Sequence, residues 1–228
     1  MKIAVSRSRT AFLILALIVV ATTVVLVVNR NTTTEHLQSL SRRQTLQLDI
    51  PDSPWEPAFF TALEERTRAV GLSSLRTVLL PENDLEVRFW HDRLEIVSGV
   101  VIRRTGQEWS ASWIYQVEDS RPSSARLVAL DQPKSGWEVF WKNLVEGGIL
   151  TLPDSPRPQC PTEALDGISY VVETNVDGKY RTYMYSNPQL MKCAEAKQLL
   201  QLDEMIRQEF SLGENRRLDL AHKPGAIN

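Results

Sequence analysis

Residues 168–185 read ISYVVETNVDGKYRTYMY. Two runs rich in β-branched and aromatic residues flank the dipeptide Asp177-Gly178. Such a dipeptide favours a two-residue type I′ turn, so the stretch predicts a β-hairpin. A two-residue turn also fixes the strand register and places Tyr183 opposite Val172.

One face of this predicted hairpin is rich in tyrosine. Tyr170, Tyr183 and Tyr185 share it, because side chains two residues apart in a strand lie on the same side. This face is the more apolar of the two, and we expect it to pack on the core. Glu173 lies on the opposite face, which we expect to meet solvent.

The segments around the hairpin alternate between helical and extended patterns. Apolar residues at spacings of three and four predict helices at 55–70, 136–146 and 188–210. Extended patterns predict strands at 75–80, 85–90, 95–103, 108–117 and 126–130. This order is typical of an α+β domain with a mainly antiparallel sheet packed by about three helices.

A continuous apolar run occupies residues 11–28 and is interrupted only by Thr22 and Thr23. A helix of this length extends about 27 Å, close to the roughly 30 Å of a bilayer's hydrocarbon core. The apolar part of a cleaved signal peptide is shorter, about 7–15 residues. The sequence therefore favours a retained transmembrane helix in contact with the lipid bilayer, and the alternative is a cleaved signal peptide.

The charges beside this run indicate its orientation. Lys2, Arg7 and Arg9 precede it in a short tail, and such a tail normally stays in the cytoplasm. We expect a single-pass protein of a bacterial inner membrane, with its C-terminal domain periplasmic or extracellular. The predicted divisions are a cytoplasmic tail (1–10), the transmembrane helix (11–28), a polar stalk or linker (31–54), the extracytoplasmic α+β domain (55–212) and a flexible tail (213–228).

The charge balance excludes one class of partner. The chain has 26 basic and 28 acidic side chains, and its first 30 residues contain no acid. The acidic excess therefore belongs to the globular part, whereas a nucleic-acid-binding domain shows a basic excess or a basic stripe. We expect no nucleic-acid partner, and the sequence does not indicate an oligomeric state.

The chain has two cysteines, Cys160 and Cys193. They lack the close spacing of zinc or redox motifs. In an oxidising compartment they can form one disulfide, which would close a loop of about 33 residues and stabilise the fold by about 3–4 kcal/mol. The alternative is a pair of unrelated thiols.

The sequence contains no familiar catalytic or cofactor motif. His91-Asp92 is the one local pairing of a histidine with a carboxylate, and no nucleophile motif accompanies it. There is no glycine-rich phosphate loop and no metal-binding pattern of His or Cys. We therefore expect no cofactor and no metal, and we interpret His91 as a surface residue of a turn.

Two groups of side chains near the hairpin are candidates for a site. Asp166, Glu173 and Asp177 can supply an acid–base pair of the kind used by glycosidases, although their spacing does not require it. The candidates for binding are Tyr170, Tyr180, Arg181, Tyr183 and Tyr185. Such rings suit a groove for a peptide or a glycan, but packing in the core is the simpler interpretation.

The sequence as a whole favours a membrane-anchored extracytoplasmic binding or envelope-assembly module without recognisable catalytic machinery. Its partner would be an envelope protein, a peptide or a glycan. The alternative is a periplasmic carboxylate-dependent hydrolase, directed at a glycan or a peptide, with its site near the hairpin at 166–185.

Overall fold

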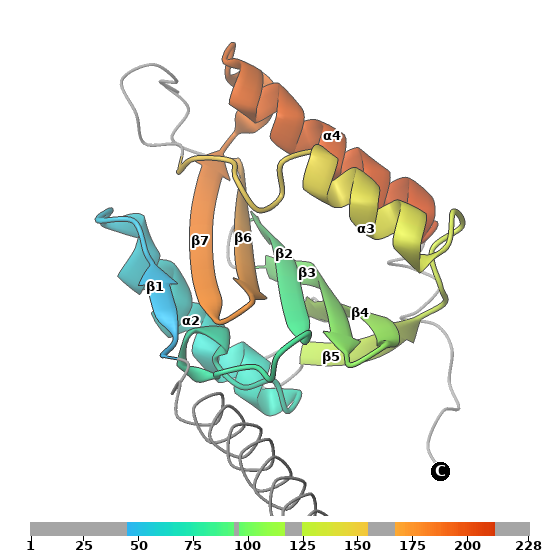
Figure 1. Ribbon diagram of the computed structural model, residues 1–228. Coiled ribbons are helices and arrows are strands. Elements are labelled where there is room, and N and C mark those ends of the chain that lie inside the picture. The colour runs from blue at the N-terminus through green and yellow to red at the C-terminus, as the bar shows by residue number, and fades with distance from the viewer. Residues whose placement is uncertain (1–44, 94–95, 117–124, 155–166, 213–228) are drawn as a thin grey trace, which may run out of the picture. The chain divides into compact units, whose positions relative to one another are not determined.

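The computed structural model describes residues 45–93, 96–116, 125–154 and 167–212 (Figure 1). The strands among them form one seven-stranded sheet in the order β1-β7-β6-β2-β3-β4-β5. Neighbouring strands are antiparallel except β1 and β7, which are parallel. The elements are β1 (Gln47–Asp49), α2 (Trp55–Ala69), β2 (Leu85–Arg93), β3 (Ile96–Thr105), β4 (Glu108–Gln116), β5 (Ala125–Leu130), α3 (Trp137–Glu146), β6 (Ile168–Val176), β7 (Lys179–Ser186) and α4 (Ala194–Glu209).

The sheet has a helical layer on each face. Helices α3 and α4 pack on one face, and α2 packs on the other (Figure 1). The structure thus confirms an α+β domain with a mainly antiparallel sheet and three packed α-helices over the described residues. The predicted transmembrane run at 11–28 lies outside these residues, and none of the helices within them has the length and apolar character to span a bilayer.

Each face of the sheet carries its own apolar core. The larger core, beneath α3 and α4, includes Val87, Phe89, Ile102, Phe140, Leu144, Val172, Tyr183, Tyr185, Leu199, Leu202 and Ile206. The smaller core, beneath α2, contains Leu63, Leu72, Trp90, Val97, Val101, Ile114 and Val171. Because both faces are covered, consecutive side chains of the central strands are buried, and burial does not alternate from one residue to the next.

The hairpin of β6 and β7 has the predicted turn and register. Asp177 and Gly178 have φ angles of 51° and 72°, the left-handed values that a type I′ turn requires. Tyr183 pairs with Val172 and Tyr185 with Tyr170. This part of the fold follows from local sequence chemistry alone.

The segment at 75–80, predicted as a strand, instead contains a 3₁₀ helix at Leu75–Thr77. The side-chain amide of Asn175 on β6 donates to the carbonyls of Leu75 and Val78, at 3.2 and 2.8 Å. These bonds hold the segment against the sheet as a turn, so it joins no strand ladder. The prediction of a strand was wrong because this anchor comes from a residue 100 positions away.

The ends of the globular part also differ from the sequence prediction. Strand β1 lies within the stretch 31–54 that was expected to be a stalk or linker, and it extends the sheet beyond β7. The last helix was expected from Pro188, but that proline starts only a 3₁₀ turn, Pro188–Leu190. The chain then runs extended at Met191 and Cys193 before α4 begins.

Candidate functional site

Two ionisable residues lie side by side on the sheet face that α2 covers. Arg88 on β2 and Glu173 on β6 are opposite each other in the strand register. Both are buried, at 3% and 2% exposed. The prediction that Glu173 faces solvent was wrong, because α2 and the segment after it cover this face of the sheet.

The carboxylate of Glu173 is held by two neutral donors. The Trp90 indole Nε1 donates to Oε2 at 2.8 Å, and the Tyr180 hydroxyl donates to Oε1 at 3.0 Å. Trp90 can take this position because Gly99 lies opposite it on β3. A Cβ at residue 99 would come within 2.5 Å of Trp90 Cε3, so any other residue would displace the indole.

Arg88 is fixed by groups on either side of it. Its Nε donates to Glu86 Oε1 at 2.7 Å, and its Nη2 donates to the Ser73 carbonyl at 2.8 Å. The other oxygen of Glu86 accepts from Arg103 Nε at 2.7 Å. By contrast, Arg88 Nη1 lies 4.0 Å from Glu173 Oε2, which is an ion pair without a hydrogen bond.

A second arginine reaches the same region from the 3₁₀ helix. Arg76 Nη2 lies 2.6 Å from Glu56 Oε1 on α2, and its guanidinium carbon lies 3.9 Å from the centroid of the Phe60 ring. Asn175 positions Arg76 indirectly, because it holds the 3₁₀ helix against β6.

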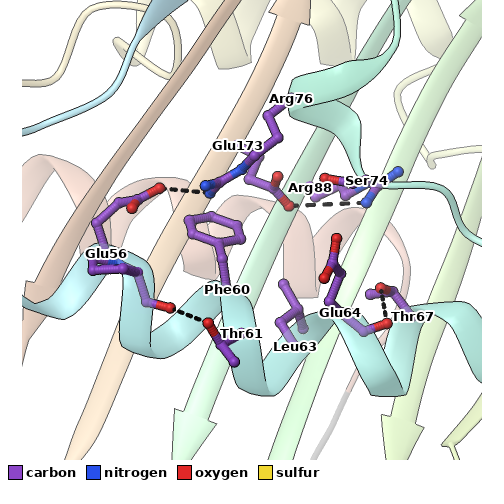
Figure 2. A pocket seen from close by; sticks show the side chains of 11 residues that line it. Glu56, Phe60, Thr61, Leu63, Glu64, Thr67, Ser74, Arg76, Arg88 and Glu173 are labelled. Carbon is purple, nitrogen blue, oxygen red and sulfur yellow. Dashed lines mark hydrogen bonds and ion pairs between the residues drawn. The ribbon is translucent and has the colours of Figure 1, made fainter.

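These groups line a pocket of about 200 Å³ between α2 and the sheet, here called the α2 pocket. Figure 2 shows Phe60, Leu63 and Glu64 pointing from α2 toward Arg88 and Glu173 on the strands. The lining residues are Glu56, Pro57, Phe60, Thr61, Leu63, Glu64, Thr67, Ser74, Arg76, Arg88 and Glu173. A more open hollow of about 300 Å³ beside it shares Glu64 and Ser74, so the concave surface continues along α2.

Burial sets the direction of the pKa shifts of Glu173 and Tyr180. It raises the pKa of Glu173, although the charge of Arg88 and the hydrogen bonds from Trp90 and Tyr180 act in the opposite direction. Burial, together with the charge of Glu173, also raises the pKa of Tyr180, so its hydroxyl stays protonated as a donor. The site therefore combines a permanent cation, Arg88, with a carboxylate whose ionisation is opposed by its surroundings.

Three of the five predicted binding residues lie in the larger core. Tyr170, Tyr183 and Tyr185 are all buried, and Tyr183 has no exposed surface. The Tyr183 hydroxyl donates to the Ile149 carbonyl at 2.9 Å, and the Tyr185 hydroxyl donates to the Pro153 carbonyl at 2.8 Å. In this structure these rings pack against α3 and α4 and tie the chain after α3 to the hairpin.

The remaining predicted residues are dispersed. Arg181 links β7 to Asp49 on β1 at 2.9 Å and donates to the Leu150 carbonyl at 3.0 Å. Tyr180 alone of the five lies on the α2 side, through its bond to Glu173.

Of the three candidate carboxylates, only Glu173 lines the α2 pocket as the structure describes it. Asp177 is an exposed turn residue, and Asp166 lies outside the described residues. Cys160 also lies outside them, so the disulfide with Cys193, the residue that precedes α4, stays a prediction.

His91 has a different partner from the one its sequence neighbour suggested. It lies on β2, and its Nε2 is 2.7 Å from Asp203 Oδ1 on α4. Arg207 Nε donates to the other oxygen of Asp203 at 2.9 Å. Although burial acts to raise the pKa of Asp203, the hydrogen bond and charge of His91 and the charge of Arg207 lower it. The histidine is thus part of a link between the sheet and α4, not a plain surface residue of a turn.

Sequence reasoning missed the two arginines of the α2 pocket. A usable signal was present in β2, where Glu86 and Arg88 alternate with Val87 and Phe89 and therefore share one face. Arg76 gave no such signal, because its position depends on a turn that only the folded chain forms.

Among the described residues, no three His, Cys, Asp or Glu side chains are grouped so that they could hold a metal ion. Comparison of the chain with protein-family models, curated proteins and solved structures finds no significant match.

Proposed function

We propose that this chain is a membrane-anchored extracytoplasmic binding module whose ligand site is the α2 pocket. The single observation that carries the proposal is a cavity with two buried ionisable side chains, Arg88 and Glu173, in its lining. Buried charges are costly, and well-packed apolar residues usually stabilise a fold equally well or better. Charged groups that converge on a cavity are instead typical of ligand sites.

The size of the pocket limits the ligand. About 200 Å³ is below the roughly 300–1,000 Å³ of sites that hold drug-sized molecules. The α2 pocket itself therefore admits a small molecule, or one small group of a larger partner such as an envelope protein, a peptide or a glycan, the rest of which can lie in the adjoining hollow of about 300 Å³.

A blocking variant tests this assignment. Thr61 lines the pocket and is exposed on α2, so Thr61→Trp should fill the pocket while leaving the fold intact. Ala62→Trp adds the same side chain at the next exposed position, which does not line the pocket. Ligand-observed NMR with a library of small soluble molecules should find compounds that bind the wild type and Ala62→Trp but not Thr61→Trp. A library without any such compound would contradict the proposal.

The membrane anchor and its orientation are supported by the apolar run at 11–28 and the basic residues that precede it. An alkaline phosphatase fusion at the C-terminus should be active, and mass spectrometry of the membrane-extracted protein should find residues 1–28 retained. A mature N-terminus near Thr23 or Asn29 would show instead that the run is a cleaved signal peptide.

A second candidate is the carboxylate-dependent hydrolase. The raised pKa of Glu173 favours it, because a general acid must hold its proton near neutral pH. The two hydrogen bonds that the carboxylate already accepts favour a structural role instead. An assay for hydrolysis products, with glycan and peptide fragments as substrates, tests this candidate. Products that the wild type forms and Glu173→Gln does not would favour the hydrolase.

A further inference from the structure

The arginine and glutamate side chains that line the α2 pocket differ in the distance to their nearest group of opposite charge. Each guanidinium has a close carboxylate, with Arg76 at 2.6 Å from Glu56 and Arg88 at 2.7 Å from Glu86. Arg88 donates a hydrogen bond to Glu86, whereas Arg76 and Glu56 form an ion pair without a hydrogen bond, and Arg76 Nε and Nη2 are buried without a hydrogen-bond partner among the described residues. Each arginine thus has a carboxylate of the fold within contact distance, although Arg88 shares Glu86 with Arg103.

Among the described residues, two carboxylates of the same pocket have no guanidinium as close as these. The ion pair of Glu173 with Arg88 spans 4.0 Å, and that of Glu64 with Arg68 spans 3.9 Å, beyond hydrogen-bond distance in both cases. Glu173 is buried, whereas Glu64 is about half exposed at the edge of the pocket. Figure 2 shows the Glu64 side chain pointing from α2 toward the strands that carry Arg88 and Glu173. With every group ionised, the lining holds three carboxylates against two guanidiniums, so the charge left for a ligand to neutralise is negative.

We propose that the α2 pocket binds a small organic ammonium ion, with its nitrogen between Glu173 and Glu64 and its apolar part against Leu63. This inference rests on the proposed binding function. Each oxygen of Glu173 accepts one hydrogen bond from Trp90 or Tyr180 and has a second lone pair for an N–H of the ligand. Glu64 supplies further acceptors from the opposite wall.

The lining distinguishes this class from other cations. A divalent metal ion would need more oxygen ligands, and the described residues contain no group of three metal-binding side chains. A quaternary ammonium ion is held by several aromatic faces. Phe60 is the sole aromatic ring among the described residues that line the pocket, and Arg76 already covers one of its faces. An ammonium ion that donates hydrogen bonds is therefore the ligand that fits.

Four probes of similar size test the proposal: butylammonium chloride, sodium butyrate, butan-1-ol and tetramethylammonium chloride. Equilibrium dialysis of the full-length protein in detergent, with empty micelles as the reference, measures how much of each is bound. Butylammonium should bind, and Thr61→Trp should abolish the binding. Glu173→Gln should weaken it about tenfold or more, as for a buried charge-assisted bond, and Glu64→Gln by about two- to fivefold, as for an exposed pair.

Glu82→Gln is the matched control, since Glu82 is an exposed acid that does not line the pocket. Glu64→Gln changes an exposed helix position, so it tests the proposal even if Glu173→Gln fails to fold. Butylammonium binding that survives both substitutions would overturn the proposal.

A different outcome is that butyrate, butanol or tetramethylammonium binds, that butylammonium does not, and that Thr61→Trp abolishes this binding. The pocket would then be a ligand site, but its ligand would not be an organic ammonium ion that donates hydrogen bonds. If none of the four probes binds in a way that Thr61→Trp abolishes, the ligand class is again wrong. The library screen then decides the binding function separately.

Discussion

Replacement of Glu173 by alanine should destabilise the domain strongly. The side chain is buried and accepts hydrogen bonds from the Trp90 indole and the Tyr180 hydroxyl. Alanine would leave both donors buried without these acceptors, at a cost of about 1–3 kcal/mol each. The free energy of unfolding should therefore fall by about 2–6 kcal/mol, a large fraction of the roughly 5–15 kcal/mol typical of a whole domain.

Glutamine at position 173 should cost far less. Its carbonyl can accept from Trp90, and its amide can donate to the Tyr180 oxygen, so both donors stay hydrogen-bonded after a rotation of the hydroxyl. Glutamine also removes a carboxylate whose charged form burial disfavours. We expect a loss of less than about 1 kcal/mol, within the range of a neutral hydrogen-bond exchange.

Urea unfolding followed by tryptophan fluorescence measures these differences. Glu82→Ala is the control at an exposed turn position and should change stability by no more than about 0.5 kcal/mol. If Glu173→Ala lies within the same limit, the side chain is not held as described, and the reasoning about the α2 pocket is refuted.

Three further predictions concern the rest of the fold. Tyr183→Ala should lower the free energy of unfolding by about 3–5 kcal/mol, since the ring is fully buried; a loss of under about 1 kcal/mol would contradict its place in the core. Because the pKa of Asp203 is lowered in the folded state, its contacts with His91 and Arg207 stabilise the protein above the unfolded pKa of about 4, and this stability is lost as the pH falls through the folded pKa. Asp203→Asn should therefore reduce the fall in the free energy of unfolding as the pH is lowered below about 4. An unchanged pH dependence would show that Asp203 does not stabilise the fold in this way. A thiol assay on unfolded, unreduced protein should label neither Cys160 nor Cys193, and labelling of both would rule out the disulfide.

The parts of the fold that were predictable depend on local chemistry. The hairpin register follows from Asp177 and Gly178, and the buried positions of α4 follow from the spacing of Leu199, Leu202 and Ile206. These signals lie within a few residues of the structure that they specify. They require no knowledge of what packs above or below the strand.

The α2 pocket was not predictable in this way. Glu173 is a charged residue followed by Thr174 and Asn175, and its burial depends on α2, more than a hundred residues earlier. Arg76 reaches the pocket because Asn175 holds in place a 3₁₀ turn whose local sequence predicts a strand. Strand alternation indicated which residues share a face with Glu173, but the hairpin pattern did not show that a helix covers that face.

The indole resonance of Trp90 offers the most direct test of the α2 pocket as a site for an ammonium ion. The Trp90 N–H donates to Glu173, so a ligand that reaches this carboxylate must change the environment of that proton. Protein labelled with ¹⁵N-tryptophan would be titrated with butylammonium chloride, and Trp90→Phe would assign the signal. We predict a progressive, saturable shift of the Trp90 indole signal while that of Trp137, on the opposite side of the sheet, stays in place. An unmoved Trp90 signal, or equal shifts of both, would contradict binding of an ammonium ion at Glu173.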